Sequence, residues 1–161
     1  MKPIVLATDG SPSAAEATLR AVELAHSLGA PLIAVSVEHV TVPSYGYYGY
    51  AQILGELNKI EREHVEATLN QAKAIATEAH VPCDTVASSG LVVDEICKVA
   101  RIRDAQMIVI GAHGWGPMRR MLHGSVSTAV LHEAPCPVLV VRGGPEPIHA
   151  DTRQLEVASV G

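Results

Sequence analysis

Short apolar runs alternate along the chain with longer stretches in which apolar residues recur at helical spacing. The short runs are rich in β-branched residues and are expected to form strands over residues 4–8, 32–37, 83–88, 107–110 and 138–141, the third of them being the weakest. This alternation is typical of βαβ units. It predicts an α/β fold, a single-domain doubly wound parallel sheet with helices on both faces.

The intervening stretches carry recognisable helix start and stop signals. Ser13 with Glu16 is expected to form a capping box at the start of the first helix, and Gly29 is expected to end that helix. A second helix of unusual length is predicted from about Gln52 to Ala79, because apolar residues step along it by four and three positions: Val65, Leu69, Ala72, Ala76 and Ala79. Two shorter helices are predicted, one after Gly90 with an apolar face of Val92, Ile96, Val99 and Ala100, and one over residues 125–132.

Two segments do not fit this periodic pattern. All four tyrosines lie in residues 45–50, among Gly and Pro, and this loop is expected to be either a surface that binds a partner or a flap. Residues 143–161 hold Gly, Pro and scattered charges without a period, and we expect a loosely ordered tail there. The predicted domain therefore spans residues 1–142.

Composition narrows the class of protein. Apolar residues make up 48% of the 161-residue chain with no Phe and one Trp, so the core must be built mainly from Val, Ile, Leu and Ala. The formal net charge is -5 and the 12 Lys and Arg form no long run, which argues against nucleic-acid binding. The three cysteines lie far apart, and no stretch has the length or apolar character of a membrane span. These features predict a cytoplasmic protein without a disulfide framework or paired-thiol zinc site.

Two predicted strands end in residues that suit a ligand. Thr8, Asp9 and Gly10 follow the first strand, and the sequence Gly-Ala-His-Gly over residues 111–114 follows the fourth. In open α/β sheets, ligands bind beyond the carboxyl ends of the strands, where the strand order reverses. We therefore expect the site at these two strand ends.

The spacing of glycines after the fourth strand predicts a phosphate-binding site. Gly111 and Gly114 permit close backbone approach, while Gly124 and Ser125 open the last helix, whose free amides and positive dipole end suit a phosphate. The hydroxyls of Ser125 and Ser127 are expected to add donors. The pattern is neither a Walker A motif, since no Gly-Lys-Ser or Gly-Lys-Thr occurs, nor a dinucleotide fingerprint.

Residues from other segments are expected to complete this site. Asp9 is placed for ribose hydroxyls, although it can also cap the first helix, and Val37 is placed to pack against a base. Arg119 and Arg120 either reach the phosphates or stay solvated. His113 is expected to be a hydrogen-bonded loop residue rather than a catalyst.

These segments together resemble the universal stress protein family, in its ATP-binding branch. The resemblance rests on Thr-Asp-Gly-Ser over residues 8–11, Gly-Ala-His-Gly over residues 111–114, Gly-Ser-Val-Ser over residues 124–127 and Pro-Cys-Pro-Val-Leu-Val-Val over residues 135–141. Ala112 departs from the family pattern, in which Ser or Thr is frequent at that position. The resemblance covers residues 1 to about 142.

The resemblance implies a strand order of 3-2-1-4-5, the order of an adenine nucleotide alpha hydrolase-like fold, and a homodimer paired through the last strand, Val138–Val141. It implies ATP, or ADP or AMP, as the ligand, with any Mg²⁺ bound through the nucleotide phosphates. The nucleotide-binding residues that it implies, together with their neighbours in the same motifs, are Thr8, Asp9, Val37, Gly111, Gly114, Gly124, Ser125, Val126 and Ser127.

The expected function is a stress-response regulatory module whose nucleotide state modulates a partner protein. No residue of the sequence is identified as a catalytic base or a metal ligand. Slow ATP hydrolysis or self-phosphorylation remains an alternative activity. An adenylyl-transferring enzyme on a related fold is the alternative, and it is disfavoured because His-x-Gly-His and Ser-Gly-Gly elements are absent. A third reading, an interaction protein that has lost its ligand, is disfavoured by the intact glycines.

Overall fold

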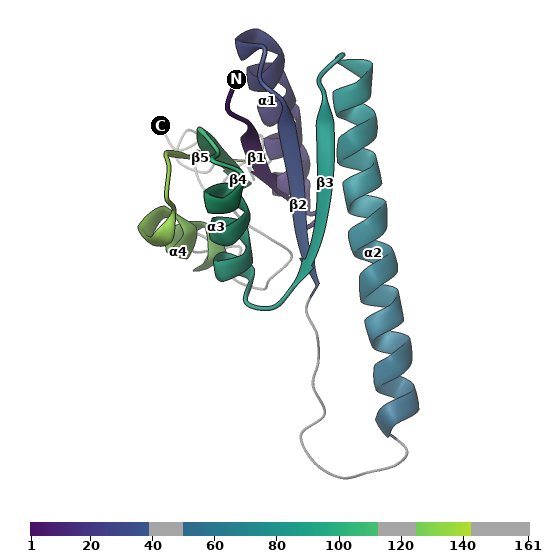
Figure 1. The fold of residues 1–161 in the computed structure, drawn as a ribbon. Coiled ribbons are helices and arrows are strands. Elements are labelled where there is room, and N and C mark those ends of the chain that lie inside the picture. Colours follow the sequence, from purple (N-terminus) through teal and green to yellow (C-terminus); the bar gives the residue numbers. More distant parts are fainter. Residues whose placement is uncertain (39–49, 113–124, 143–161) are drawn as a thin grey trace, which may run out of the picture.

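The computed structural model of the chain describes residues 1–38, 50–112 and 125–142. Its centre is a sheet of five parallel strands (Figure 1). The strands are β1 (Ile4–Ala7), β2 (Leu32–Glu38), β3 (Cys83–Ser89), β4 (Met107–Gly111) and β5 (Val138–Val141). Their order is β3-β2-β1-β4-β5, which confirms the doubly wound arrangement expected from the sequence.

The register of the strands brings several carboxyl ends together at one edge of the sheet. Ala7, the last residue of β1, pairs with Val35 of β2 on one side and with Ile110 of β4 on the other. Gly111 in turn pairs with Val141 at the end of β5. The strand order reverses between β1 and β4, and this is the switch point at which such sheets bind ligands.

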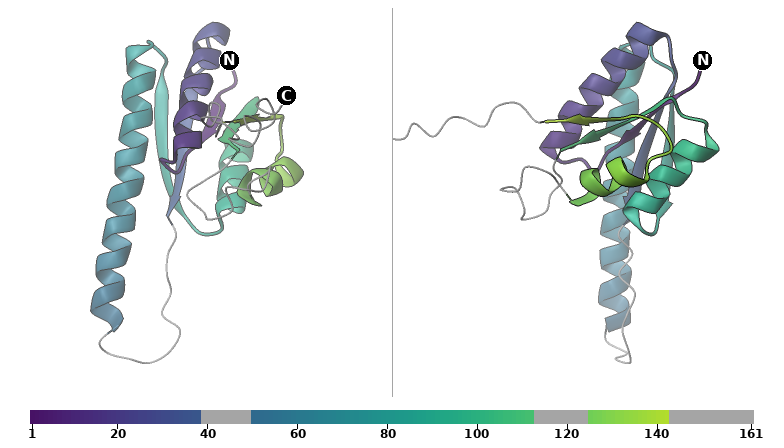
Figure 2. Two further views of the ribbon diagram at one scale, coloured as in Figure 1. Left: turned by 180° about the vertical axis from the view of Figure 1, so that it is seen from behind. Right: turned by 90° about the vertical axis from the view of Figure 1, so that its left-hand side faces the viewer.

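Helices cover both faces of the sheet (Figure 2). The helices α1 (Pro12–Leu28) and α2 (Tyr50–Glu78) pack on one face, and α3 (Val92–Ile102) and α4 (Ser125–Glu133) pack on the other. Alternate residues of β1, β2, β4 and β5 enter the two cores. Ile4 and Leu6 belong to the α1–α2 side, whereas Val5 and Ala7 belong to the α3–α4 side.

The start of α1 differs from the predicted capping box. Ser11 is the capping residue, because its side chain accepts a hydrogen bond of 3.2 Å from the amide of Ala14. Pro12 then takes the first helical position, where its fixed φ favours the helix and its missing amide costs nothing. Ser13 is consequently inside the helix and buried, so the prediction of a Ser13–Glu16 box was wrong. Gly29 ends the helix with φ +62°, as predicted.

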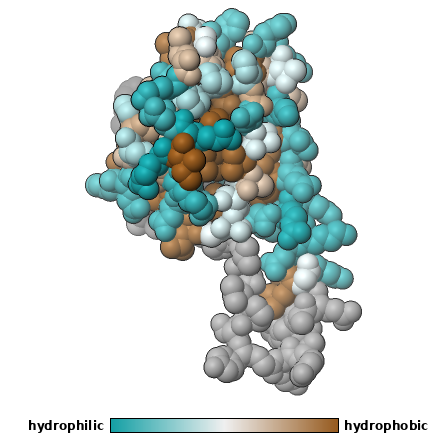
Figure 3. Space-filling view, viewed as in Figure 1, coloured by the Kyte–Doolittle hydropathy of each residue, from teal (hydrophilic) through white to brown (hydrophobic). Residues whose placement is uncertain are grey.

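The helix α2 is longer than the strand beside which it packs. Its 29 residues span about 44 Å, whereas the seven residues of β2 span about 23 Å. Its amino-terminal part therefore projects beyond the sheet, as Figure 1 shows. The predicted apolar stripe is buried from Val65 to Ala76, but Ile53, Leu57 and Ile60 are 56%, 50% and 62% exposed, and Figure 3 shows apolar residues at the projecting end.

Among the helices in the described ranges, none is both long enough and apolar enough to cross a membrane. The predicted tyrosine loop up to residue 49 and the predicted tail over residues 143–161 lie outside the described residues.

Candidate nucleotide site

The residues that follow β1 lie at the centre of the sheet edge. Thr8 is buried, and its amide donates to the carbonyl of Val35 at 3.0 Å, which prolongs the pairing of β1 with β2. Its hydroxyl accepts from the amide of Gly10 at 3.4 Å. Thr8 thus fixes the point at which the chain leaves the sheet.

Asp9 forms a tight turn with an exposed side chain. Its Oδ1 accepts a hydrogen bond of 2.9 Å from the amide of Ser11, the capping residue of α1. Gly10 between them has φ +75°, a conformation that L side chains rarely adopt. The turn therefore presents the Asp9 carboxylate at the sheet edge. Asp9 does not cap α1, because Ser11 takes that role, and Asp9 instead holds the amide of Ser11.

The helix α2 contacts this turn through two residues that sequence reasoning missed. The Nε2 atom of His64 lies 3.0 Å from the backbone carbonyl oxygen of Asp9. A carbonyl oxygen only accepts, so Nε2 carries the proton in this contact. A Cβ added to Gly10 would lie 2.8 Å from Oγ1 of Thr68. The available signal was Thr68 itself, a polar residue on the apolar face of α2 between Val65 and Leu69.

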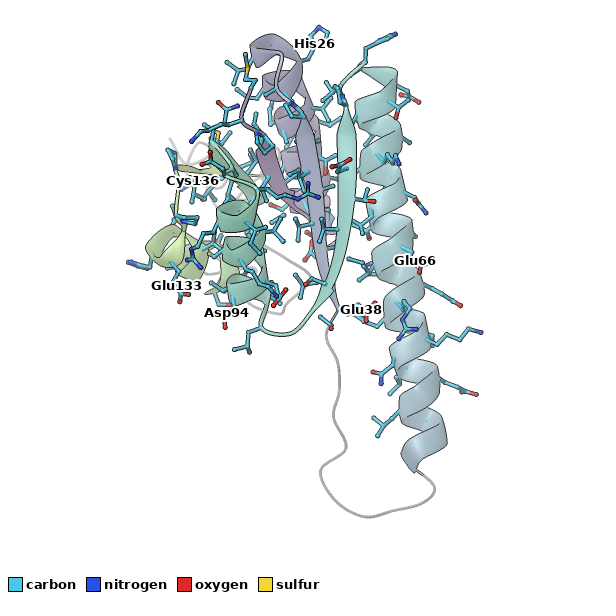
Figure 4. All side chains as sticks on the ribbon, viewed as in Figure 1. His26, Glu38, Glu66, Asp94, Glu133 and Cys136 are labelled. Carbon is cyan, nitrogen blue, oxygen red and sulfur yellow. The ribbon has the colours of Figure 1, made fainter. Side chains whose placement is uncertain are left out.

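The end of β2 supplies a small apolar surface beside β1. Val37 is half-buried and packs against the core on the α3–α4 side. The neighbouring Glu38 forms an ion pair with Arg62 of α2, with Nε and Oε1 3.6 Å apart, and Figure 4 shows Glu38 at the end of β2. Both β1 and β2 are thus tied to α2 at their carboxyl ends.

A polar cluster lies at the end of β3, next to Val37 in register. Ser88, which pairs with Val37, donates a hydrogen bond from its hydroxyl to the Glu95 carboxylate of α3. This bond and, secondarily, Lys98 hold the pKa of Glu95 below its ordinary value. Ser88 and Glu95 form no recognisable motif, so this cluster could not be predicted from the sequence.

Gly111 is required for packing inside the protein. A Cβ at this position would lie 2.8 Å from the carbonyl carbon and 2.9 Å from the carbonyl oxygen of Ser13, in the first turn of α1. The next residue, Ala112, donates its amide to the carbonyl of Val141 at 2.7 Å. The end of β4 is therefore closely packed between α1 and β5.

The start of α4 presents the predicted Ser-Val-Ser residues in three environments. Ser125 is exposed, Val126 is half-buried against the α3–α4 core, and Ser127 is buried. The hydroxyl of Ser127 donates to the carbonyl of Ala112 at 3.3 Å, which ties α4 to the end of β4. The other predicted site residues lie outside the described residues: Gly114, Arg119, Arg120 and Gly124. His113, which was expected to be a loop residue, also lies outside them.

The chemical groups at this edge suit binding of a polar ligand. They comprise the exposed Asp9 carboxylate, the apolar side chain of Val37 and the amino-terminal turn of α4. Within residues 1–38, 53–112 and 125–142, no group of three or more His, Cys, Asp and Glu is arranged to hold a metal ion. A separate hollow of about 280 Å³ lies at the opposite edge, near Pro3, Pro31 and Pro82.

Comparisons with known proteins agree with the resemblance noted in the sequence. The model of the universal stress protein family matches residues 1–142. A universal stress protein of Methanocaldococcus jannaschii is 34% identical over 145 residues, which cover 88% of this chain and 82% of that protein. One from Mycobacterium tuberculosis is 35% identical over 146 residues, and the match covers 87% of this chain but 45% of the longer relative.

Solved structures show the same fold. The universal stress protein UspA from Lactobacillus plantarum is 29% identical, with a TM-score of 0.77 and coverage of 88% of this chain and 97% of that one. A universal stress protein solved in complex with cAMP is 25% identical, with a TM-score of 0.68 and coverage of 88% and 97%. From the match over residues 1–142 and these relatives, the chain belongs to the universal stress protein family.

Proposed function

We propose that the chain binds an adenine nucleotide at the edge formed by the carboxyl ends of β1, β2 and β4. The observation that carries the proposal is that Asp9 and Val37 lie at strand ends on one edge of the sheet, at its switch point, and that the start of α4 is bonded to this edge through Ser127 and Ala112. The related protein solved with cAMP supports an adenine-containing ligand. ATP is the expected nucleotide, with ADP and AMP as alternatives.

Each part of the nucleotide has a proposed partner. The Asp9 carboxylate accepts hydrogen bonds from ribose hydroxyls, and Val37 packs against the base. The amides and Ser125 at the start of α4 receive the phosphates, because a helix amino terminus carries unpaired donors and a positive dipole end. Gly114 and Gly124 are proposed to allow close approach, and Arg119 and Arg120 to be available to the phosphates. Any Mg²⁺ is held through the phosphates.

The proposed role is regulatory, in the stress response. Nucleotide occupancy of a cytoplasmic domain, residues 1–142, would alter its binding to a partner protein. Slow ATP hydrolysis or self-phosphorylation is the second candidate activity. The Asp9 carboxylate, the apolar side chain of Val37 and the start of α4 support binding of a ligand, which the regulatory role requires. A homodimer paired through β5 is part of the proposal.

The test is calorimetric titration of ATP, ADP, AMP and cAMP into the wild-type protein and into Asp9→Asn. The substitution removes the charge from the proposed ribose acceptor, and hydrogen bonds to charged groups contribute about 1.5 to 3 kcal/mol. We therefore expect a loss in affinity of about 10- to 100-fold. Asp84→Asn, at the opposite edge of the sheet, should leave the affinity unchanged.

Two results would contradict the proposal. Wild-type protein that binds none of the four nucleotides at millimolar concentration has no such site. Equal affinity of Asp9→Asn and wild type would remove Asp9 from the ribose contact.

A further inference from the structure

The helix α2 contacts the two strand ends that carry the proposed ribose and base contacts. His64 meets the backbone of Asp9 after β1, with Nε2 3.0 Å from the carbonyl oxygen. Arg62 meets Glu38, the neighbour of Val37, at the end of β2. The side chains of Arg62 and His64 are both exposed. The Arg62 ion pair therefore contributes little, whereas the His64 contact reaches the Asp9 turn itself.

The Asp9 turn is held by contacts from three directions. Its own residues supply two of them, the Asp9 carboxylate with the Ser11 amide and the Thr8 hydroxyl with the Gly10 amide. The third comes from outside the turn, because His64 is 55 positions away in the sequence. His64 thus adds a contact from a separate element, α2, to the hydrogen bonds that the turn makes within itself.

The packing around Gly10 shows how closely α2 approaches this peptide. A Cβ on Gly10 would lie 2.8 Å from the Thr68 hydroxyl and 3.3 Å from Cε1 of His64. Thr68 is buried, with 6% of its surface exposed, and lies one helical turn from His64, so its side chain forms a rigid steric boundary for the turn. The turn can therefore rotate little toward α2 while His64 holds its carbonyl oxygen.

We propose that His64 is a positioning residue for the ribose site, acting through the Asp9 backbone. His64 donates to the Asp9 carbonyl oxygen while Thr68 limits movement of the turn toward α2. Together these contacts orient the carboxylate that accepts hydrogen bonds from the ribose hydroxyls. This inference rests on the proposed nucleotide binding and adds a residue to it. If His64 acts by positioning Asp9, its removal should lower the affinity only for ligands that carry ribose hydroxyls. The effect should also require the Asp9 carboxylate.

The test compares the affinities for ATP and for 2′,3′-dideoxy-ATP, which lacks both ribose hydroxyls. His64→Leu removes the donor and keeps an apolar body. It should weaken ATP binding about three- to tenfold, the size of one ordinary hydrogen bond, and leave dideoxy-ATP binding unchanged. His64→Gln restores an N–H donor and should recover most of the ATP affinity. Glu66→Leu, an exposed control on the same helix labelled in Figure 4, should change neither affinity.

A double-mutant cycle completes the test. In the Asp9→Asn background, His64→Leu should have little further effect on ATP binding, because the group that it positions is already impaired. Equal losses for ATP and dideoxy-ATP, or additive losses in the cycle, would overturn the inference and leave nucleotide binding standing. Wild-type protein that binds neither ligand would overturn both proposals.

Discussion

At the scale of single residues, close backbone contacts explain why position 111 holds a glycine. From the sequence, Gly111 was expected to permit close approach of a ligand. Gly111 lies against the main chain of Ser13, and the atoms nearest to an added Cβ include backbone atoms, which have little freedom to move. Its φ is not in the left-handed region, so the requirement is for space rather than for conformation. A packing role and a role beside a nucleotide are compatible, since the strand end that Gly111 fixes is the one that leads into the glycine-rich segment.

The substitution Gly111→Ala tests this packing role. Overpacking a closed contact typically costs about 1 to 3 kcal/mol, and we expect the free energy of unfolding to fall by that amount. Gly55→Ala is the matched control, because a Cβ there meets nothing within 4 Å. Because Ala has a higher helix propensity than Gly, the control should leave the free energy of unfolding unchanged or raise it by up to about 1 kcal/mol. Urea denaturation measures both variants, and an unaltered stability of Gly111→Ala would contradict the packing role.

At the scale of elements, hydrophobic periodicity predicted the strands and helices, while the polar contacts between them were not predictable. The predicted bounds of β2, β3 and β4 agree with the structure to within one residue. For β2 and β4 the reason is that parallel strands buried between helices appear as nearly continuous apolar runs, whereas β3 is a partly exposed edge strand and gave the weakest pattern. Ser11 was missed as the cap because Ser13, with Glu16 three residues later, matches the capping-box pattern, whereas Ser11 is followed at that spacing by Ala14.

The candidate site was predicted only in part. Thr8, Asp9 and Ser125 follow from local motifs, since strand and helix ends can be read from a short window of sequence. His64 and Thr68 depend on how α2 packs against a turn more than 50 residues earlier, and no local pattern contains that information.

The link between β3 and α3 through Ser88 and Glu95 gives a prediction about pH. The pKa of Glu95 is lowered in the folded protein, so its ionisation stabilises the fold above its unfolded pKa. This contribution is lost as the pH falls through the lower folded value. Because the Ser88 hydroxyl is the largest cause of the shift, Ser88→Ala should be less stable than wild type at neutral pH, and the difference should shrink as acid protonates Glu95.

Denaturation across pH 3 to 7 measures this effect, with Ser89→Ala as the control. Ser89 is the exposed neighbour at the end of β3 and should show no such dependence. A stability difference for Ser88→Ala that stays constant over this range would show that Glu95 ionisation is not involved. The pKa of Glu95 measured by NMR should rise in Ser88→Ala.

At the scale of the whole molecule, the sheet ends at β5, which pairs with β4 on its inner side. The carbonyls of Pro137 and Val141 accept from β4, so by strand alternation the peptide groups of Val138 and Val140 face outward. Val138, Leu139 and Val140 are each only half-buried. An apolar edge with outward peptide groups favours pairing with a second copy.

The proposed dimer predicts a specific response to Val140→Pro. This substitution removes an outward-facing amide without removing a bond to β4, so the monomer should still fold. Light scattering during size-exclusion chromatography should find a dimer for wild type and a monomer for the variant, with unchanged circular dichroism. Ile102→Lys, which changes an exposed apolar residue on α3, should stay dimeric. A monomeric wild type at micromolar concentration would contradict the proposed dimer.

The projecting end of α2 has a consequence for local opening of the protein. Amide hydrogen exchange should divide this helix in two, with fast exchange before residue 60 and exchange close to the global unfolding limit across the buried stripe from Val65 to Ala76. His64 lies at the border between these zones, next to the Asp9 turn. Fraying of α2 that passes residue 60 therefore ends at His64, which holds this turn. A ligand that fixes the turn should consequently slow amide hydrogen exchange across the last turns of the projecting end.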